Sequence, residues 1–112
     1  MKKYPKRGEI YWVKLAPTIG SETSKTRPGL ILSNNIGNEI TNRVIVAPIT
    51  SNIEKIYPFE VKIMIGNKES KVMLDQIRVI DKSRLGEILG EISHNELKNI
   101  EKALKLVLDI SV

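Results

Sequence analysis

Residues 44–51 read VIVAPITS, a run of β-branched and apolar residues that ends in two hydroxyl side chains. Such a run favours a strand. Pro48 has no N–H to give a neighbouring strand, which indicates a sheet edge or a bulge near the strand's end. Shorter runs of the same kind lie at residues 9–15, 29–32, 59–63 and 71–80, with turn-forming residues between them at 34–38 and 66–67. The last run is long enough for one or two strands, so we expect five or six in all.

The spacing of apolar residues changes near the C-terminus. Ser93 and Glu96 form a capping-box pattern. After them, apolar residues recur at helical spacing at Leu97, Ile100, Leu104, Val107 and Leu108. The sequence therefore predicts a mainly β, α+β fold: a small β-barrel rather than a sandwich, with a C-terminal amphipathic helix packed on one face or end.

Composition limits the possible classes of protein. The chain has 112 residues, 41% apolar and 28% charged, which predicts a single globular domain over 1–112. The absence of cysteine excludes disulfides and thiolate metal sites, and a single histidine, His94, excludes multi-histidine sites. No apolar run approaches the ~20 residues of a membrane span, and the N-terminus lacks the apolar stretch of a signal peptide. We expect a cytoplasmic protein that does not contact membranes.

The positive charge is concentrated at one end of the sequence. The formal net charge is +5, and residues 1–30 supply all of it, with seven basic and two acidic side chains. The remaining residues carry equal numbers of each sign. A local excess of this kind is a possible footprint of a polyanion such as nucleic acid. It is equally typical of a lysine-rich terminus that only improves solubility.

Two short stretches are candidates for chemistry. Arg27 precedes Pro28 at the end of a polar stretch, residues 16–27, which predicts a long loop before the strand at 29–32. A guanidinium held there can bind phosphate oxygens with its planar fork, although it can also form a structural ion pair. Thr50 and Ser51 end the strand at 44–51, where hydroxyls can donate to a phosphoryl oxygen or simply cap a turn.

In this order the motifs resemble those of the MazF/PemK (Kid) toxins, ribonuclease partners in type II toxin–antitoxin modules. The resemblance covers about residues 6–110. It rests on RGEIYWV at 7–13, GSE at 20–22 followed by Arg27-Pro28, LILSN at 30–34, VIVAPITS at 44–51 and DQIRVIDKSRL at 75–85. It departs from the family at residues 23–26, TSKT, where many relatives carry glycines. The loop here is therefore expected to be stiffer and more basic.

The resemblance implies an SH3-like barrel, a homodimer and sequence-selective cleavage of single-stranded RNA, which inhibits translation and growth. The RNA's own 2′-hydroxyl would attack the adjacent phosphorus, leaving a 2′,3′-cyclic phosphate and a 5′-hydroxyl, with no metal and no other cofactor. DNA, which lacks the 2′-hydroxyl, should not be cut. A cognate antitoxin is the implied protein partner. Its disordered, acidic and apolar tail would block the RNA groove.

The resemblance also assigns catalysis to Arg27 and Thr50. A guanidinium stays protonated in proteins, so Arg27 is expected to stabilise charge rather than to accept a proton. Glu22 is our hypothesis for the proton acceptor; a solvated loop acid is the competing interpretation. We expect contacts to RNA from eight further residues: Ser21, Lys25, Pro28, Asn34, Ser51, Lys55, Tyr57 and Gln76.

Two alternatives remain open at the level of the sequence. The related CcdB toxins share the barrel and poison gyrase without catalysis, but they bind through a last helix that ends in aromatic and small residues. The C-terminal residues 108–112, LDISV, do not match that pattern. The second alternative is a relative that binds nucleic acid without cutting it. The presence of Arg27 and Thr50 argues against it.

Overall fold

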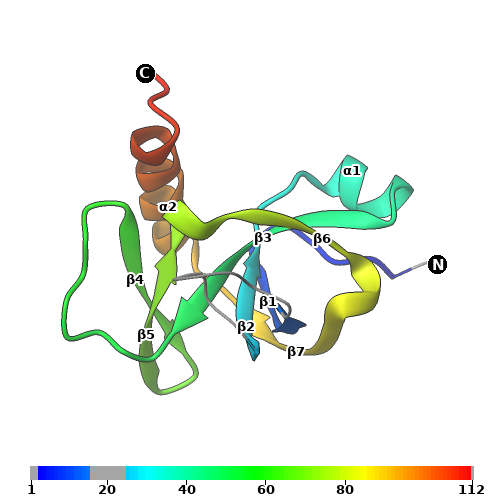
Figure 1. The fold of residues 1–112 in the computed structure, drawn as a ribbon, viewed down its shortest axis with the longest axis horizontal. Helices are drawn as coiled ribbons and strands as arrows, with labels where there is room; N and C mark the ends of the chain where they lie inside the picture. Colours follow the sequence, from blue (N-terminus) through cyan, green and yellow to red (C-terminus); the bar gives the residue numbers. More distant parts are fainter. Residues whose placement is uncertain (1–2, 16–24, 112) are drawn as a thin grey trace.

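The structure is a computed structural model, and it describes residues 3–15 and 25–111. Within these residues the chain forms seven strands, two α-helices and two short 3-10 helices (Figure 1). The strands are β1 (Glu9–Lys14), β2 (Thr26–Ile31), β3 (Arg43–Thr50), β4 (Glu60–Ile65), β5 (Lys68–Met73), β6 (Arg78–Asp81) and β7 (Leu85–Glu91). The helices are α1 (Asn35–Ile40), η1 (Leu74–Gln76), η2 (Lys82–Arg84) and α2 (His94–Val107).

Strand β3 organises the sheet. The strand order is β4-β5-β3-β2-β1-β7, every paired neighbour is antiparallel, and β6 adds to β3 outside this order. One edge of β3 pairs with β2, while the other pairs with β6 over residues 43–46 and with β5 over residues 49–50. Pro48 pairs with Gly29 of β2, but on the other edge of β3 it lies between the residues paired with β6 and those paired with β5. The exchange of partners bends the sheet into a curled half-barrel.

Strands β2 and β3 contribute to two apolar cores. Successive side chains of a strand point to opposite faces. Leu30 and Ile49 accordingly join a cluster that also contains Ile100 of α2, whereas Ile31 and Val46 join a second cluster on the other face. Burial on both faces explains why these strands read as nearly continuous apolar runs.

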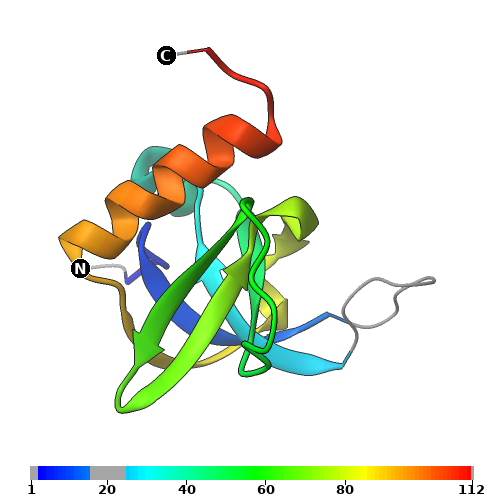
Figure 2. The same cartoon turned by 90° about the vertical axis from the view of Figure 1, so that its left-hand side faces the viewer.

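Helix α2 closes one end of the curled sheet. The predicted capping box is present: Ser93 Oγ accepts from the Glu96 N–H, and Glu96 Oε1 accepts from the Ser93 N–H. Glu96 Oε2 also accepts from the Met64 N–H of β4 at 2.9 Å, which joins the helix to the sheet. Figure 2 shows α2 lying across the end of the sheet. No helix in the described ranges is long and apolar enough to cross a membrane.

The predicted fold class is confirmed, and three details of the prediction are wrong. The sheet has seven strands rather than five or six, because β7 has glycines and mostly exposed side chains and so shows no apolar pattern. The turn expected at residues 34–38 is the start of α1, which Asn34 caps and whose buried Asn38 bonds to Ser33. Strand β2 begins at Thr26, inside the stretch expected to be a loop.

Candidate active site

A cavity of about 420 Å³ opens where β2 begins and β3 ends. It brings together both residues that we expected to be catalytic, Arg27 and Thr50, from strands separated in sequence by α1. Three of the expected RNA-contacting residues, Lys25, Pro28 and Ser51, lie in the same wall. The remaining lining residues are Trp12, Thr26, Ile49, Ile65, Lys68, Ser70 and Leu89.

The strand register explains why the two side chains meet. Strands β2 and β3 are antiparallel, with Gly29 opposite Pro48 and Leu30 opposite Ala47. Continuing this register by two residues toward the cavity places Arg27 opposite Thr50. Gly29 also lets β1 approach closely, because a Cβ at this position would lie 2.7 Å from Val13 Cγ2. The sheet thus fixes the spacing of the two groups.

The Arg27 guanidinium has a buried hydrogen-bond donor that no described residue satisfies. Arg27 is half-buried, and its Nε atom is buried without a hydrogen-bond partner among the described residues. A buried N–H donor without a partner costs free energy. Arg27 lines the cavity, and its planar guanidinium is suited to the oxygens of a bound anion; because Nε has almost no exposed surface in the unliganded protein, the side chain must shift for such an oxygen to reach it.

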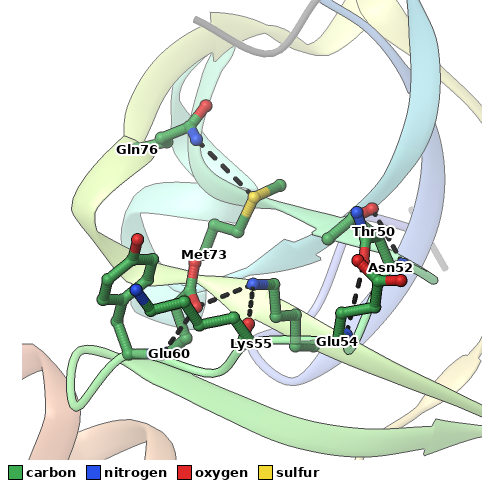
Figure 3. A network of polar contacts seen from close by, with 9 residues as sticks. Thr50, Asn52, Glu54, Lys55, Glu60, Met73 and Gln76 are labelled. Carbon is green, nitrogen blue, oxygen red and sulfur yellow. Dashed lines mark hydrogen bonds and ion pairs between the residues drawn. The ribbon is translucent and has the colours of Figure 1, made fainter. Parts of the chain in front are cut away.

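Thr50 is oriented by the segment that follows it. Its Oγ1 accepts from the Asn52 N–H at 3.2 Å, and Asn52 Oδ1 accepts in turn from the Glu54 N–H at 3.2 Å (Figure 3). A hydroxyl has one donor and two acceptor positions. Because Oγ1 is used here as an acceptor, its O–H can still donate to a ligand oxygen in the cavity.

Basic side chains extend the site beyond the first cavity. Lys25 immediately precedes β2 and has φ +69°, a backbone conformation that is uncommon outside glycine. Its carbonyl accepts from the Leu15 N–H at 2.9 Å. A second cavity, lined by Lys14, Lys25, Thr26, Ser83 and Arg84, adjoins the first at Lys25 and Thr26. Both adjoining cavities near Arg27 are therefore lined by basic side chains.

Most of the chain matches one known protein family. Residues 6–108 match the family described as the PemK-like, MazF-like toxin of type II toxin–antitoxin systems. The chain belongs to this toxin family. The predicted resemblance is confirmed.

Two relatives of this toxin are named as endoribonucleases. The chain is 39% identical to endoribonuclease MazF9 of Mycobacterium tuberculosis, over 94% of this chain and 97% of the relative. It is 36% identical to endoribonuclease EndoA of Bacillus subtilis, over 92% of this chain and 93% of the relative. Both names agree with the predicted enzyme class and not with the gyrase-poison alternative.

Solved structures of the family share the toxin's fold. A crystal structure of MazF from Deinococcus radiodurans superposes with a TM-score of 0.86 at 30% identity, covering 97% of this chain and all of that chain (100%). An endoribonuclease in complex with its cognate antitoxin, from a mycobacterial species, superposes with a TM-score of 0.82 at 28% identity. The alignment with that complex covers 96% of this chain and 98% of that chain.

The other expected site residues are not among the described residues that line the first cavity. Ser21 and Glu22 fall outside the described residues. Asn34 caps α1, where its Oδ1 accepts from the Gly37 N–H at 2.8 Å. Lys55 and Tyr57 lie exposed on the segment between β3 and β4. None of these three described residues lines the first cavity, and their contacts with RNA stay predictions.

Gln76 occupies a half-buried position on η1 of the toxin. Its Nε2 lies 3.6 Å from Met73 Sδ, as Figure 3 shows. It does not line the first cavity. A contact with a base or with the RNA backbone would therefore form outside that cavity, and this role also stays a prediction.

Sequence reasoning missed several walls of the cavity. Trp12 is 39% exposed there, although a tryptophan within a strand run is ordinarily assigned to the core. Lys68 comes from the first position of β5, and Leu89 from the unpredicted β7. Strand alternation would place Trp12 on the same face as the buried Ile10, and the bulges in the pairing of β1 with β7 break this alternation, so no local sequence signal indicated that Trp12 lines the cavity.

The titration shifts lie outside the cavity. Burial raises the pKa of Tyr11 to about 12, helped by its hydrogen bond to Glu9 and by the Glu9 charge. Hydrogen bonds from Ser83 lower the pKa of Asp81, which caps η2. No group of three or more histidine and carboxylate side chains suited to a metal ion occurs among residues 3–15 and 25–111.

Proposed function

We propose that this toxin cleaves single-stranded messenger RNA at the cavity between β2 and β3, and so arrests translation and growth. The observation that carries the proposal is the shared cavity of Arg27 and Thr50, with a buried guanidinium N–H that has no described partner. The endoribonuclease names of its relatives support the same reaction.

The proposed reaction uses the substrate's 2′-hydroxyl as nucleophile. Its oxygen forms a bond to the adjacent phosphorus while the bond to the 5′-oxygen breaks. The products are a 2′,3′-cyclic phosphate and a 5′-hydroxyl. The 2′-hydroxyl loses a proton to a base on the protein, and the leaving 5′-oxygen takes a proton from water. This scheme needs no metal ion, because the nucleophile is already part of the substrate.

Arg27 and Thr50 divide the stabilisation of the reacting phosphate. The Arg27 fork binds a non-bridging phosphoryl oxygen whose negative charge grows in the transition state, and fixed positive charge at such an oxygen is usually the main source of rate acceleration. The Thr50 O–H donates to a second phosphoryl oxygen and orients the phosphorus for in-line attack. Lys25 and Lys68 add positive charge at the cavity wall.

Glu22 is the proton acceptor in this proposal. The described lining residues of the cavity include no aspartate, glutamate or histidine. Glu22 belongs to the segment immediately before Lys25 in sequence, and a carboxylate has suitable chemistry. Glu22→Gln should lower the cleavage rate and remove the acid limb of its pH profile. An unchanged rate and pH profile would rule out this role.

The toxin's proposed partners follow from its surface and its relatives. We propose that it acts in the cytoplasm, as a homodimer, under the control of an antitoxin. The exposed apolar pair Ile45 and Val79, which are register partners on β3 and β6, supports a self-association surface beside α1. The solved complex of a mycobacterial relative with its antitoxin supports the second partner.

The test is a cleavage assay in excess chelator. The substrates are a mixed-sequence RNA, the same sequence as DNA, and the RNA with a single 2′-deoxy nucleotide at the cut site. We expect cuts in the RNA alone, with a cyclic phosphate end, and protection by the single 2′-deoxy substitution. Cleavage of the 2′-deoxy substrate would contradict the mechanism. Binding of RNA without cleavage would instead identify a non-catalytic relative.

A further inference from the structure

A lysine is buried next to the proposed site without being part of it. The side chain of Lys71 on β5 is only 10% exposed, and that of its partner Glu60 on β4 only 6%. In the sheet register, Lys71 lies opposite Thr50 of β3 on one side and opposite Lys62 of β4 on the other. Burial of both charges requires good pairing, because an unpaired buried charge is strongly unfavourable.

The Lys71–Glu60 pair holds the segment between β3 and β4, residues 51–59. Lys71 Nζ donates to Glu60 Oε1 at 2.8 Å and to the backbone carbonyl of Lys55 at 2.6 Å. Glu60 Oε1 also accepts from the Tyr57 N–H at 2.9 Å. Figure 3 shows Lys55 and Glu60 on one side of this network and Thr50, Asn52 and Glu54 on the other. Two backbone groups of the segment are thus fixed by one buried ion pair.

Little else anchors this part of the chain. Every residue from Ser51 to Pro58 is exposed except Ile53, which is half-buried. The hydrogen bonds from Asn52 and Glu54 are exposed to water, which competes for them. Apolar burial in the segment is limited to the half-buried Ile53 and Phe59, and its end is also held by the Glu60 N–H, which donates to the Tyr57 carbonyl at 2.9 Å. The part-buried contacts that tie residues 55–57 to β5 come from the Lys71–Glu60 pair.

The segment carries groups suited to reading an unpaired base. The Tyr57 ring stacks on Phe59 with centroids 5.3 Å apart and planes inclined by 4°. Lys55 Nζ lies 4.8 Å from the Tyr57 ring centroid. Phe59 covers one face of the Tyr57 ring and the Lys55 ammonium lies over the ring, so a splayed base would stack there by displacing Lys55, whose ammonium could then bind the neighbouring phosphate. The distance of this ring from the scissile phosphate decides which nucleotide it reads.

We propose that Lys71 and Glu60 are positioning residues that set the RNA sequence selectivity of the toxin. The pair fixes Tyr57 and Lys55 at a defined distance from Thr50, and so selects the base next to the cut. This inference rests on the proposed function, since it needs RNA cleavage at the cavity. Neither residue lines the cavity, so the pair acts through the segment and leaves the chemical groups in place.

The β4–β5 hairpin offers a matched control. Lys62 and Glu69 form a second lysine–glutamate pair between the same two strands, with Nζ 2.6 Å from Oε2 and side chains 52% and 47% exposed. Lys71→Met removes the buried ammonium, and Lys62→Met makes the same chemical change at the exposed pair. The double variant Lys71→Met/Glu60→Leu removes both buried charges, which avoids leaving one unpaired.

The experiment measures single-turnover cleavage of an RNA library with randomised bases around the cut site. Hydrogen exchange of residues 51–59 is followed in parallel. For Lys71→Met and for the double variant we expect at least a tenfold loss of discrimination between the preferred site and its single-base variants. The rate at the preferred site should fall much less, and exchange at the Tyr57 amide should rise. Lys62→Met should keep the wild-type selectivity and exchange.

The outcomes separate the two proposals. If wild-type protein cuts RNA and the folded variants keep its selectivity, the positioning role is wrong while the proposed function stands. A uniform loss of rate at all sites with unchanged selectivity also overturns it, because that result indicates a purely structural or chemical role. Should Lys71→Met fail to fold, the double variant decides the question. If wild-type protein cuts no RNA, both proposals fall.

Discussion

Arg27 places a buried N–H donor without a described partner beside the cavity, which is unfavourable for stability. Two neighbours restrict its backbone: Val13 pairs with it in the β1–β2 ladder, and Pro28 follows it in sequence. Its Nε is buried with no described partner. A donor in that state lowers stability, and a bound phosphate oxygen would remove the deficit. The arrangement is typical of a binding group held ready for a ligand.

The first prediction concerns the stability of an Arg27 variant. Arg27→Met keeps most of the apolar part of the side chain and removes the unsatisfied donor. We expect the free energy of unfolding of the unliganded protein to stay unchanged or to rise by up to about 1 kcal/mol. Urea denaturation followed by circular dichroism measures it. A loss of stability would contradict this expectation, because it would show that the Arg27 guanidinium makes stabilising contacts in the folded protein.

The second prediction concerns pH. The pKa of Tyr11 is about 12, because burial and Glu9 disfavour the phenolate, whereas an unfolded tyrosine ionises near pH 10. Between about pH 10 and 12 the folded state therefore keeps a proton that the unfolded state has lost, and stability falls as pH rises. Tyr11→Phe should reduce this fall. Urea midpoints measured across that interval test it, and parallel curves for both proteins would contradict it.

At the scale of elements, the β4–β5 hairpin joins two ion pairs of very different surroundings. Lys71–Glu60 is buried and bonded to backbone groups, whereas Lys62–Glu69 is about half exposed. Exposed pairs contribute little because water screens them. Breaking a buried pair leaves one charge without a partner in a poorly hydrated site.

The third prediction follows from this contrast. Lys71→Met should lower the free energy of unfolding by about 3 to 5 kcal/mol, and Lys62→Met by less than about 1 kcal/mol. The double variant Lys71→Met/Glu60→Leu should recover most of the loss, since no charge is then left unpaired. Thermal and urea denaturation of the three variants measure these differences. Equal losses for Lys71→Met and Lys62→Met would contradict the burial argument.

The elements also show what the sequence can and cannot predict. The apolar runs of β2 and β3 and the capping box of α2 were recognisable because their patterns are local. Strand β7 was not, because its pairing with β1, rather than its own composition, makes it a strand. Helix α1 was missed for a similar reason: its Asn-rich residues read as a turn, and the buried bonds of Asn38 hold it.

The residues of the candidate site also fall into those that sequence motifs predict and those that only the folded sheet brings together. Arg27 and Thr50 were found from motifs, but the register that sets them opposite one another is a property of the sheet. Trp12 and Lys68 could not be assigned to the cavity, because they belong to β1 and β5, strands that are distant in sequence from β2 and β3 or whose pairing with them no local pattern indicates. Lys71 read as an ordinary strand residue, since burial of a lysine depends on a partner eleven residues away in sequence.

At the scale of the whole molecule, part of the N-terminal basic excess lies at the proposed site, while Lys3, Lys6 and Arg7 lie elsewhere. The basic excess of residues 1–30 includes Lys14, Lys25 and Arg27, which line the two adjoining cavities, and Arg84 of η2 joins them in the second cavity. A connected basic surface attracts the phosphates of a single strand on both sides of the cut. Under the proposed function, Lys14, Lys25 and Arg27 would contribute to binding the RNA backbone.

The fourth prediction concerns assembly. Ile45 and Val79 are 41% and 56% exposed as neighbours on β3 and β6, and α1 beside them exposes Ile36 and Ile40, each 74%. An apolar surface of this kind favours a symmetric contact between two copies. We expect a dimer by sedimentation equilibrium, and a monomer for Ile45→Glu/Val79→Glu. Replacing the exposed Leu106 of α2 with glutamate is the control, and a dimer unaffected by the double change would refute this surface.

The fifth prediction concerns the joint action of Arg27 and Thr50 on one phosphate. A double-mutant cycle on RNA cleavage tests it. Wild type, Arg27→Met, Thr50→Val and the double variant are compared in single-turnover reactions, with Lys62→Met as the control. If both groups act on one phosphate, each single change should slow cleavage by about 100-fold or more. The double change should then slow it by less than the product of the two effects. Wild-type cleavage rates for folded Arg27→Met and Thr50→Val would contradict the account.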